Sequence, residues 1–412
     1  MINILWGLMG CTIIVLGAYL LSENRKAINI WTVSMGFIAQ VVLGFFVLKW
    51  DFGMKVIQVL SDGVSKVMDY GVEGLAFVFG SLADKEGAAG PIFAINALAI
   101  MIYLTALIGL LYHFGVMQWF VRIVGGSLSK IMKTGHIEST NAAANIFLGM
   151  TQSFLSVKPY IKTMSRSQLF AVMVGGLASV SGAVLLGLAA MGIPINYLLS
   201  AAIMSAPAGL MLAKLIIPET EKLDPNEWKV VVEDSPTEIG EKSSVMEVIV
   251  DESKEGMKFA VNAVVILVSI IGLIALLNGI LGGVGSLVGF SDLSFELILG
   301  YVFAPVAFIL GIPWSEAVLA GNLLGQKIII NEFVAFASFK DIIGSFSEKS
   351  VAILTFALSG FANIGSIGII LGVMLGIAPK RKKEIQGMAL KGLIAATLAN
   401  LLNGAIVGIF FF

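Results

Sequence analysis

Apolar stretches of about 20 residues recur along most of the chain and are separated by short polar segments. A helix of that length crosses the hydrocarbon core of a bilayer, which is about 30 Å thick. The strongest candidates are residues 2–21, 30–48, 92–112, 167–191, 195–217, 259–281, 350–376 and 385–412. The pattern therefore predicts an all-α polytopic membrane protein with about eight transmembrane helices.

Other segments are too short, too polar or too rich in glycine to cross a membrane alone. We expect interfacial helices or re-entrant hairpins at residues 54–68, 117–133, 141–162, 246–258 and 315–339. Residues 295–312 are long enough to span, but we expect Pro305 to break them. The acidic, proline-containing run 219–242 predicts a solvated loop.

Composition supports a membrane protein and argues against several other classes. Of the 412 residues 58% are hydrophobic and 13% are charged, which is about half the charged fraction of a soluble domain. The net charge is −1 and the chain has no basic tract, so we expect no nucleic-acid partner. The single cysteine, Cys11, excludes an intramolecular disulfide. The two histidines, His113 and His136, complete no catalytic motif, so we expect no enzyme.

Basic residues predict the orientation of the chain in the membrane. Arg25 and Lys26 follow the first apolar run, and the basic cluster 380–383 precedes the last one. Loops rich in Lys and Arg stay on the cytoplasmic side. We therefore expect a multi-pass protein with both termini facing outward.

A weak internal repeat points to a transport site. Residues 145–152 form a polar-interrupted segment that is followed by an apolar helix containing the sequence LASVSG, residues 177–182. Residues 322–336 form a second such segment, followed by a helix containing FANIGS, residues 361–366. Paired broken helices in two halves predict a substrate site near the bilayer midplane and alternating access. Packing of small residues between helices is the alternative.

Glu332 is the sharpest candidate for substrate binding, because a carboxylate at membrane depth is costly and is usually retained for handling an ion or substrate. It can accept two hydrogen bonds from adjacent hydroxyls, as in a ribose. Asn363 and Ser366, three residues apart on the other broken helix, would face the same cavity. A structural ion pair between Glu332 and Lys327 is the alternative.

A sodium site is the second candidate, because sodium prefers hard oxygen ligands. Side-chain oxygens are available at Asn145, Thr151 and Ser179, and exposed carbonyls are expected at Leu148 and Val180. Polar residues of these types also cap re-entrant helices, so a purely capping role remains open.

At these residues the chain resembles the concentrative nucleoside transporters. Residues 325–336, GQKIIINEFVAF, match the family signature G-x-K-x-x-x-N-E-F-V-A-aromatic without a gap. Shorter matches run in the family's order from residue 74 to residue 376. They include FVFG at 77–80, GVMQW at 115–119, Glu138-Ser139 followed by Asn145, KPY at 158–160, FAN at 361–363 and SIG at 366–368.

The resemblance implies a homotrimer in which each protomer has two re-entrant hairpins and two unwound helices around its own site. It implies nucleoside uptake driven by a sodium or proton gradient, with an elevator-like movement. The chain then divides into scaffold helices at 1–133, a first transport region at 134–217, a solvated loop with interfacial and scaffold helices at 218–314, and a second transport region at 315–412.

Carried over by position, the resemblance also assigns residues. Glu332, Asn363 and Ser366 would hold the ribose, Phe361 would line the pocket and Val184 would lie near the base. The sodium ligands would be Asn145, Thr151 and Ser179, with the carbonyls of Leu148 and Val180. Because all three side chains are present, we expect sodium coupling rather than proton coupling, and no other cofactor.

The end of the site that reads the base departs from the family pattern. Where the family usually has G-Q-T-E, this chain has Gly149, Met150, Thr151 and Gln152. An amide and a carboxylate are lost, while the flexible Met150 adapts to a larger ring. We therefore expect a bacterial inner-membrane carrier whose base preference is shifted toward purines. Relaxed base selectivity, proton coupling and a channel for a small polar solute are the alternatives.

Overall fold

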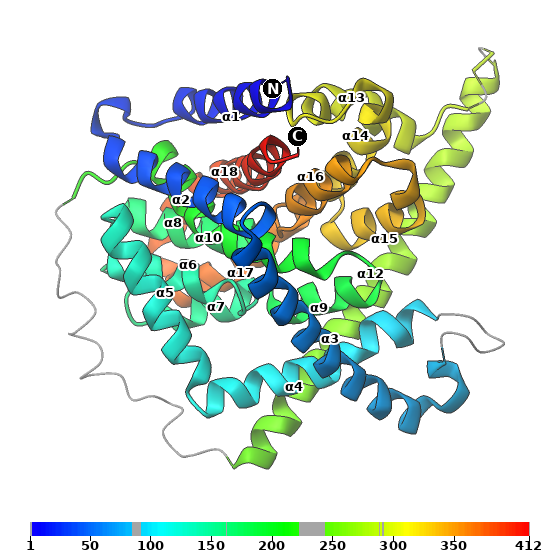
Figure 1. The fold of residues 1–412 in the computed structure, drawn as a ribbon, viewed down its shortest axis with the longest axis horizontal. Coiled ribbons are helices and arrows are strands. Elements are labelled where there is room, and N and C mark those ends of the chain that lie inside the picture. Colours follow the sequence, from blue (N-terminus) through cyan, green and yellow to red (C-terminus); the bar gives the residue numbers. More distant parts are fainter. Residues whose placement is uncertain are drawn as a thin grey trace.

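A computed structural model describes residues 2–84, 92–161, 163–221, 244–287, 289–290 and 292–411. In these ranges the elements are helices, and they form one body with the long helix α12 (Val245–Leu287) along its edge (Figure 1). Most of the predicted solvated loop, residues 222–242, lies outside the described residues.

Three helices precede the repeated part of the chain: α1 (Ile2–Leu20), α2 (Ile30–Leu48) and α3 (Asp51–Phe79). Helix α1 packs along the C-terminal helix α18 (Lys382–Ile409). The two ends of the chain are joined by Asn3, whose Nδ2 donates to the Phe411 carbonyl at 2.7 Å. Both termini therefore lie side by side (Figure 1), in agreement with the prediction that they share one side of the membrane.

The rest of the chain contains the same order of elements twice: two helices, a hairpin of two helices, a helix broken in the middle, and a final helix. The first set is α4 (Ile100–His113), α5 (Val116–Met132), α6 (His136–Ala144), α7 (Met150–Ser156), α8 (Arg166–Ala178), α9 (Gly182–Ala190) and α10 (Ile195–Ile216). The second set is α12, α13 (Phe295–Ile309), α14 (Trp314–Ile329), α15 (Glu332–Ile342), α16 (Glu348–Leu358), α17 (Ile364–Ile377) and α18.

The two sets keep a common register around the hairpin tips and the helix breaks. Helix α7 begins at Met150 and α15 at Glu332, while α9 begins at Gly182 and α17 at Ile364, so both pairs of starting residues are 182 positions apart. The repeat predicted from the sequence is therefore present in the fold, and each residue near one tip has a definite counterpart near the other.

Burial separates the centre of the molecule from its edge. In the segments able to span a membrane, 89% of residues are buried in α10 and 78% in α18 and the turn before it, against 6% in α12. The exposed, apolar surface of α12 suits contact with lipid, where no water is present to solvate polar side chains. The breaks themselves, residues 179–180 and 359–363, are buried, so their freed backbone groups lie where protein partners are available.

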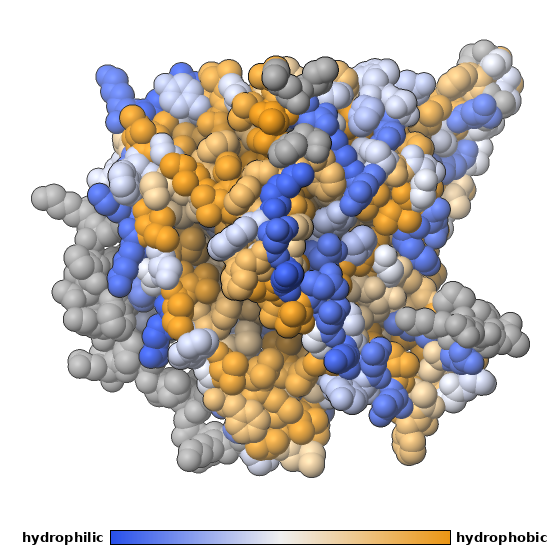
Figure 2. Space-filling model, in the orientation of Figure 1, coloured by the Kyte–Doolittle hydropathy of each residue, from blue (hydrophilic) through white to orange (hydrophobic). Residues whose placement is uncertain are grey.

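A polar stripe crosses the apolar surface. Figure 2 shows an orange surface divided by a diagonal blue band, and the band follows the course of α3 in Figure 1. Helix α3 has charged residues along one side, among them Lys55, Asp62 and Lys66, and buries Ile57 and Leu75 on the other. This amphipathic pattern is the one expected of an interfacial helix, as predicted for residues 54–68.

The described part of the chain has seven helices able to span a membrane, or eight if the bent pair α13 and α14 counts as one span. Six of the eight predicted spans correspond to such segments, one of which, 166–190, contains the break between α8 and α9, and residues 259–281 belong to the seventh, α12. The predicted span 350–376 is not one helix, because residues 359–363 separate α16 from α17.

Two expectations about helix ends were wrong. Residues 246–258 do not form a separate interfacial helix; they are the first turns of α12. Their charged residues form pairs along the helix surface, such as Lys254 Nζ with Asp251 Oδ1 at 3.0 Å, so the helix extends beyond its apolar part. Pro305 lies inside α13 without breaking it. The turn comes later, at Gly311, whose φ of +100° strains any residue with a side chain.

Candidate functional site

The two hairpin tips and the two helix breaks meet in one place. At the first tip, the Phe147 carbonyl accepts a hydrogen bond from Gly182 N at 3.0 Å, which joins it to the α8/α9 break. The two breaks are joined to each other by Phe361 N, which donates to the Ser179 carbonyl at 3.2 Å. Helix α7 of the first hairpin also packs on α17 of the second half. The predicted site residues therefore come from four segments of one junction.

Glu332, Asn363 and Ser366 form a connected group. Glu332 is the first residue of α15 and Asn363 caps α17, and each is 4% exposed. Asn363 Nδ2 donates to Glu332 Oε2 at 3.0 Å, and Ser366 N donates to Asn363 Oδ1 at 2.8 Å. Both side chains stand at helix N-termini, where the peptide dipoles favour negative charge. The arrangement holds a carboxylate inside the protein with acceptor capacity to spare.

The candidate sodium ligands lie at the first tip and the first break. Asn145 is 1% exposed and Ser179 is 3% exposed. Each bonds a carbonyl four residues earlier, Asn145 Nδ2 to Asn141 at 2.9 Å and Ser179 Oγ to Gly175 at 3.0 Å, which is the local role that a capping interpretation expects. Asn145 Oδ1, in contrast, is buried without a hydrogen-bond partner among the described residues. A buried oxygen in that state fits a cation.

The residues expected near the base are less closely connected. Met150 is buried and lies beside Gly176 of α8: a Cβ built on Gly176 would be 3.5 Å from Met150 Cγ. Val184 is fully buried. Thr151 and Gln152 are exposed on the first turn of α7. Gln152 Oε1 accepts a hydrogen bond from Gly149 N at 3.4 Å, so it turns back toward the hairpin tip. Phe361, in the second break, is 9% exposed.

Asn400 is part of the junction and was not predicted. It is fully buried on α18, and its Nδ2 donates to the carbonyls of Ala178 at 2.6 Å and Ser359 at 3.2 Å, one at each break. Its Oδ1 accepts from Lys327 Nζ at 2.8 Å. Lys327 and Glu332, the pair of the alternative interpretation, attract each other electrostatically but are not in ion-pair contact: Lys327 binds Asn400 and Glu332 binds Asn363.

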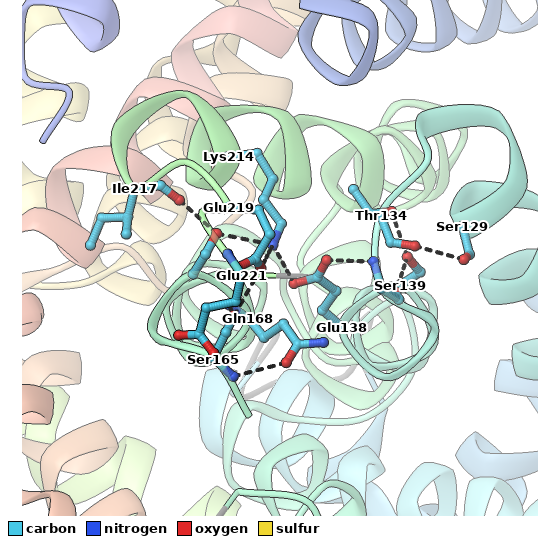
Figure 3. A network of polar contacts seen from close by, with 12 residues as sticks. Ser129, Thr134, Glu138, Ser139, Ser165, Gln168, Lys214, Ile217, Glu219 and Glu221 are labelled. Carbon is cyan, nitrogen blue, oxygen red and sulfur yellow. Dashed lines mark hydrogen bonds and ion pairs between the residues drawn. The ribbon is translucent and has the colours of Figure 1, made fainter. Parts of the chain in front are cut away.

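A second buried network fixes the base of the first hairpin (Figure 3). Lys214, in the last turn of α10, lies 2.7 Å from Glu138 Oε2 and 3.1 Å from Glu219 Oε2, and donates to Ser167 Oγ at 3.0 Å. Glu138 Oε1 in turn accepts from Gly135 N at 2.7 Å. The Glu138-Ser139 motif therefore ties the start of α6 to α8 and α10, away from the hairpin tips.

A cavity of about 350 Å³ adjoins this network and is lined by Thr32, Lys133, Lys214, Glu219 and Glu221, among others. None of its lining residues belongs to the predicted substrate or sodium sets. The polar junction of tips and breaks, rather than this cavity, therefore brings the predicted site residues together.

Three family models match the chain. One described as "Na+ dependent nucleoside transporter C-terminus" covers residues 197–408, its N-terminal companion covers residues 9–82, and "Nucleoside recognition" covers residues 94–195. Together they span both halves of the repeat and the two helix breaks.

Relatives and solved structures agree with these models. The chain is 46% identical to "Uncharacterized transporter YutK" of Bacillus subtilis, over 99% of this chain and 100% of that protein. It is 41% identical to "Nucleoside permease NupC" of Helicobacter pylori, over 98% and 97%.

Among solved structures, CNTnw in an inward-facing substrate-bound state has a TM-score of 0.92 at 41% identity, covering 99% of this chain and 98% of that one. A CNTnw variant in an outward-facing state has a TM-score of 0.95 at 40% identity, with the same coverage. Fold, junction and sequence therefore lead to one conclusion: the chain belongs to the concentrative nucleoside transporter family, a family of multi-pass membrane transporters.

Proposed function

We propose that this protein takes up nucleosides in symport with sodium by alternating access. The observation that carries the proposal is the buried pair of Glu332 and Asn363, in which a carboxylate and an amide from different segments meet inside the protein-walled junction at 3.0 Å. Such a pair is costly at membrane depth and is usually retained to handle a polar ligand. Because the family contains nucleoside transporters, we take that ligand to be a nucleoside.

The ribose is the part of a nucleoside that this pair fits. Its two adjacent hydroxyls are donors, and the Glu332 carboxylate has further lone pairs beyond the one that Asn363 occupies. The Asn363 amide and the Ser366 hydroxyl add groups that donate and accept within one helical turn. We assign ribose binding to Glu332, Asn363 and Ser366, with Phe361 at the edge of the pocket.

Sodium coupling is supported by the unpartnered Asn145 Oδ1 and by the description of the family model, which names sodium dependence. Ser179 and Thr151 hydroxyls and the carbonyls of Leu148 and Val180 are the other proposed ligands. These are hard, neutral oxygens of the kind that a monovalent cation prefers. The ion would neutralise negative carbonyl ends at the first break and thereby favour the geometry that binds the nucleoside.

Movement and assembly follow the same reasoning. Structures of CNTnw have been described in outward-facing, intermediate and inward-facing states, and this chain overlays on them with TM-scores of 0.92 to 0.95. We propose that the two hairpins and broken helices move together, as an elevator, against the remaining helices of a homotrimer in the bacterial inner membrane. The exposed apolar face of α12 is consistent with a helix that contacts lipid or a neighbouring protomer.

We further propose a base preference shifted toward purines. Met150 and Gln152 replace the amide and carboxylate that the family usually carries, so ring N–H donors lose an anionic acceptor. Met150 is buried and flexible, which accommodates a larger ring. Relaxed selectivity without a purine preference is the alternative.

The test is uptake of labelled inosine and labelled uridine into proteoliposomes, with and without an inward sodium gradient. We expect saturable, concentrative uptake that requires sodium, with inosine taken up at least as fast as uridine. Uptake driven by a pH gradient in sodium-free buffer would show that protons, rather than sodium ions, drive transport. Flux that never exceeds equilibrium and never saturates would identify a channel and contradict the proposal.

A further inference from the structure

Two lysines are buried in the described part of the chain, and their surroundings differ. Lys214 is 5% exposed and lies within ion-pair distance of two carboxylates, Glu138 and Glu219. Lys327 is 1% exposed and takes part in none of the ion pairs among the described residues; its Nζ binds the neutral oxygen of Asn400. Glu332 is near enough for electrostatic attraction, but it is occupied by Asn363. Lys327 is therefore a buried lysine without a carboxylate in contact.

What balances this charge is the pair of helix breaks. Asn400 accepts from Lys327 and donates to the Ala178 and Ser359 carbonyls, which end helices α8 and α16. The C-terminal end of a helix carries partial negative charge. The Asn400 amide therefore links the Lys327 ammonium, through hydrogen bonds, to the partially negative C-terminal ends of α8 and α16. An isolated buried ammonium would be unfavourable, and this arrangement compensates it.

The register of the repeat gives this lysine a specific counterpart. The 182-residue separation that relates Met150 to Glu332 and Gly182 to Ile364 also relates Asn145 to Lys327. Asn145 is the proposed sodium ligand with an unpartnered oxygen. By the same separation Ser179, the hydroxyl ligand, corresponds to Phe361. The second half thus has an ammonium and an aromatic ring where the first half has oxygen ligands for a cation.

We propose that Lys327 is a built-in cation, which does at the second break what the exchangeable sodium does at the first. The inference rests on the proposed sodium coupling and goes beyond it, because it explains why one half of a repeated site needs an ion and the other does not. It follows that each chain binds a single sodium ion, and that removing the ammonium opens a second cation site.

The decisive variant is Lys327→Asn, which places at the second hairpin tip the amide that Asn145 provides at the first. Binding of radioactive sodium to the purified, detergent-solubilised protein is measured to saturation, without nucleoside. We expect one ion per chain in the unsubstituted protein, two in Lys327→Asn, and one in Lys327→Arg, which keeps the charge. The sodium dependence of nucleoside binding should become cooperative in Lys327→Asn alone. A folded Lys327→Asn variant that binds one ion per chain would overturn the inference.

Two further variants separate this inference from the proposed function. Asn145→Ala should remove the ion bound by the unsubstituted protein, whereas Asn403→Ala, which changes a buried amide on α18 one turn from Asn400, should leave one ion bound. If the unsubstituted protein binds no sodium, the sodium site and the inference both fail. If it binds one ion but Lys327→Asn does too, only the inference fails. If Lys327→Asn does not fold, two ions on the unsubstituted protein would still contradict it.

Discussion

The two hairpin-and-break units have the same backbone plan but different side chains. At the first break Ser181 caps α9 by accepting from Val184 N at 3.3 Å, and at the second Asn363 caps α17 by accepting from Ser366 N at 2.8 Å. The amide has a donor left over, and it reaches Glu332. Met150, at the position corresponding to Glu332, offers no such group.

This difference shows how a repeated fold acquires two functions. The caps are required in both halves because a helix that begins inside the membrane must satisfy its first N–H groups. Exchanging serine for asparagine keeps the cap and adds one donor, and exchanging methionine for glutamate adds a charge. The second half thereby becomes a polar binding surface, while the first keeps neutral oxygens and apolar side chains.

The strongest test of this comparison removes the charge from the second unit. Glu332→Gln keeps the shape but loses a charged acceptor, and hydrogen bonds to a charged group contribute about 1.5–3 kcal/mol each. We expect nucleoside affinity to fall by about 100-fold, since each factor of ten is about 1.4 kcal/mol. Equilibrium binding of labelled nucleoside at saturating sodium measures it. Glu348→Gln, at an exposed glutamate of the same half, should bind as the unsubstituted protein does; equal affinity in both variants would contradict the assignment.

A second test concerns the packing that distinguishes the breaks. Gly360 lies against Asn400, and a Cβ there would be 2.7 Å from Asn400 Cγ, whereas the corresponding residue of the first half is already an alanine, Ala178. Gly360→Ala should displace the Asn400 amide from both carbonyls and lower the free energy of unfolding by about 1–3 kcal/mol. Thermal unfolding in detergent measures the loss.

Its control is Gly368→Ala, on the exposed side of α17, where a Cβ meets nothing within 4 Å. That variant should unfold at or slightly above the temperature of the unsubstituted protein, because alanine favours a helix over glycine. If Gly360→Ala were equally stable, the contact with Asn400 would not restrict the second break, and the two breaks would be equivalent in packing.

The sequence predicted the hairpins and breaks because their signal is local. Polar residues such as Asn145, Ser179 and Asn363 interrupt apolar runs, and in a membrane such interruptions have few explanations. The same local reasoning failed where polar residues continue a helix, at the start of α12, and where a proline is tolerated, at Pro305. Neither charge nor proline alone decides where a helix ends when neighbouring helices satisfy the backbone.

Asn400 was missed for a different reason. It is a single amide in the last apolar helix, and its partners Lys327 and Ala178 are 73 and 222 residues away. Nothing near it in the sequence distinguishes it from Asn403, which is equally buried but does not bind the breaks among the described residues. Only the fold brings α18 between the two breaks and gives one asparagine its partners.

The smallest expected effect concerns the first unit, where the comparison predicts a base-reading rather than a sugar-reading role. Gln152→Glu with Met150→Gln restores the family's usual amide and carboxylate at the start of α7. A carboxylate accepts ring N–H donors better than an amide does, so uridine should gain about threefold to tenfold over inosine in competition uptake, roughly 0.6–1.4 kcal/mol. Ribose recognition through Glu332 should not change, so affinity for the preferred nucleoside stays similar. An unaltered competition profile would mean that the first hairpin does not read the base, and selectivity would then lie with Val184 and Phe361.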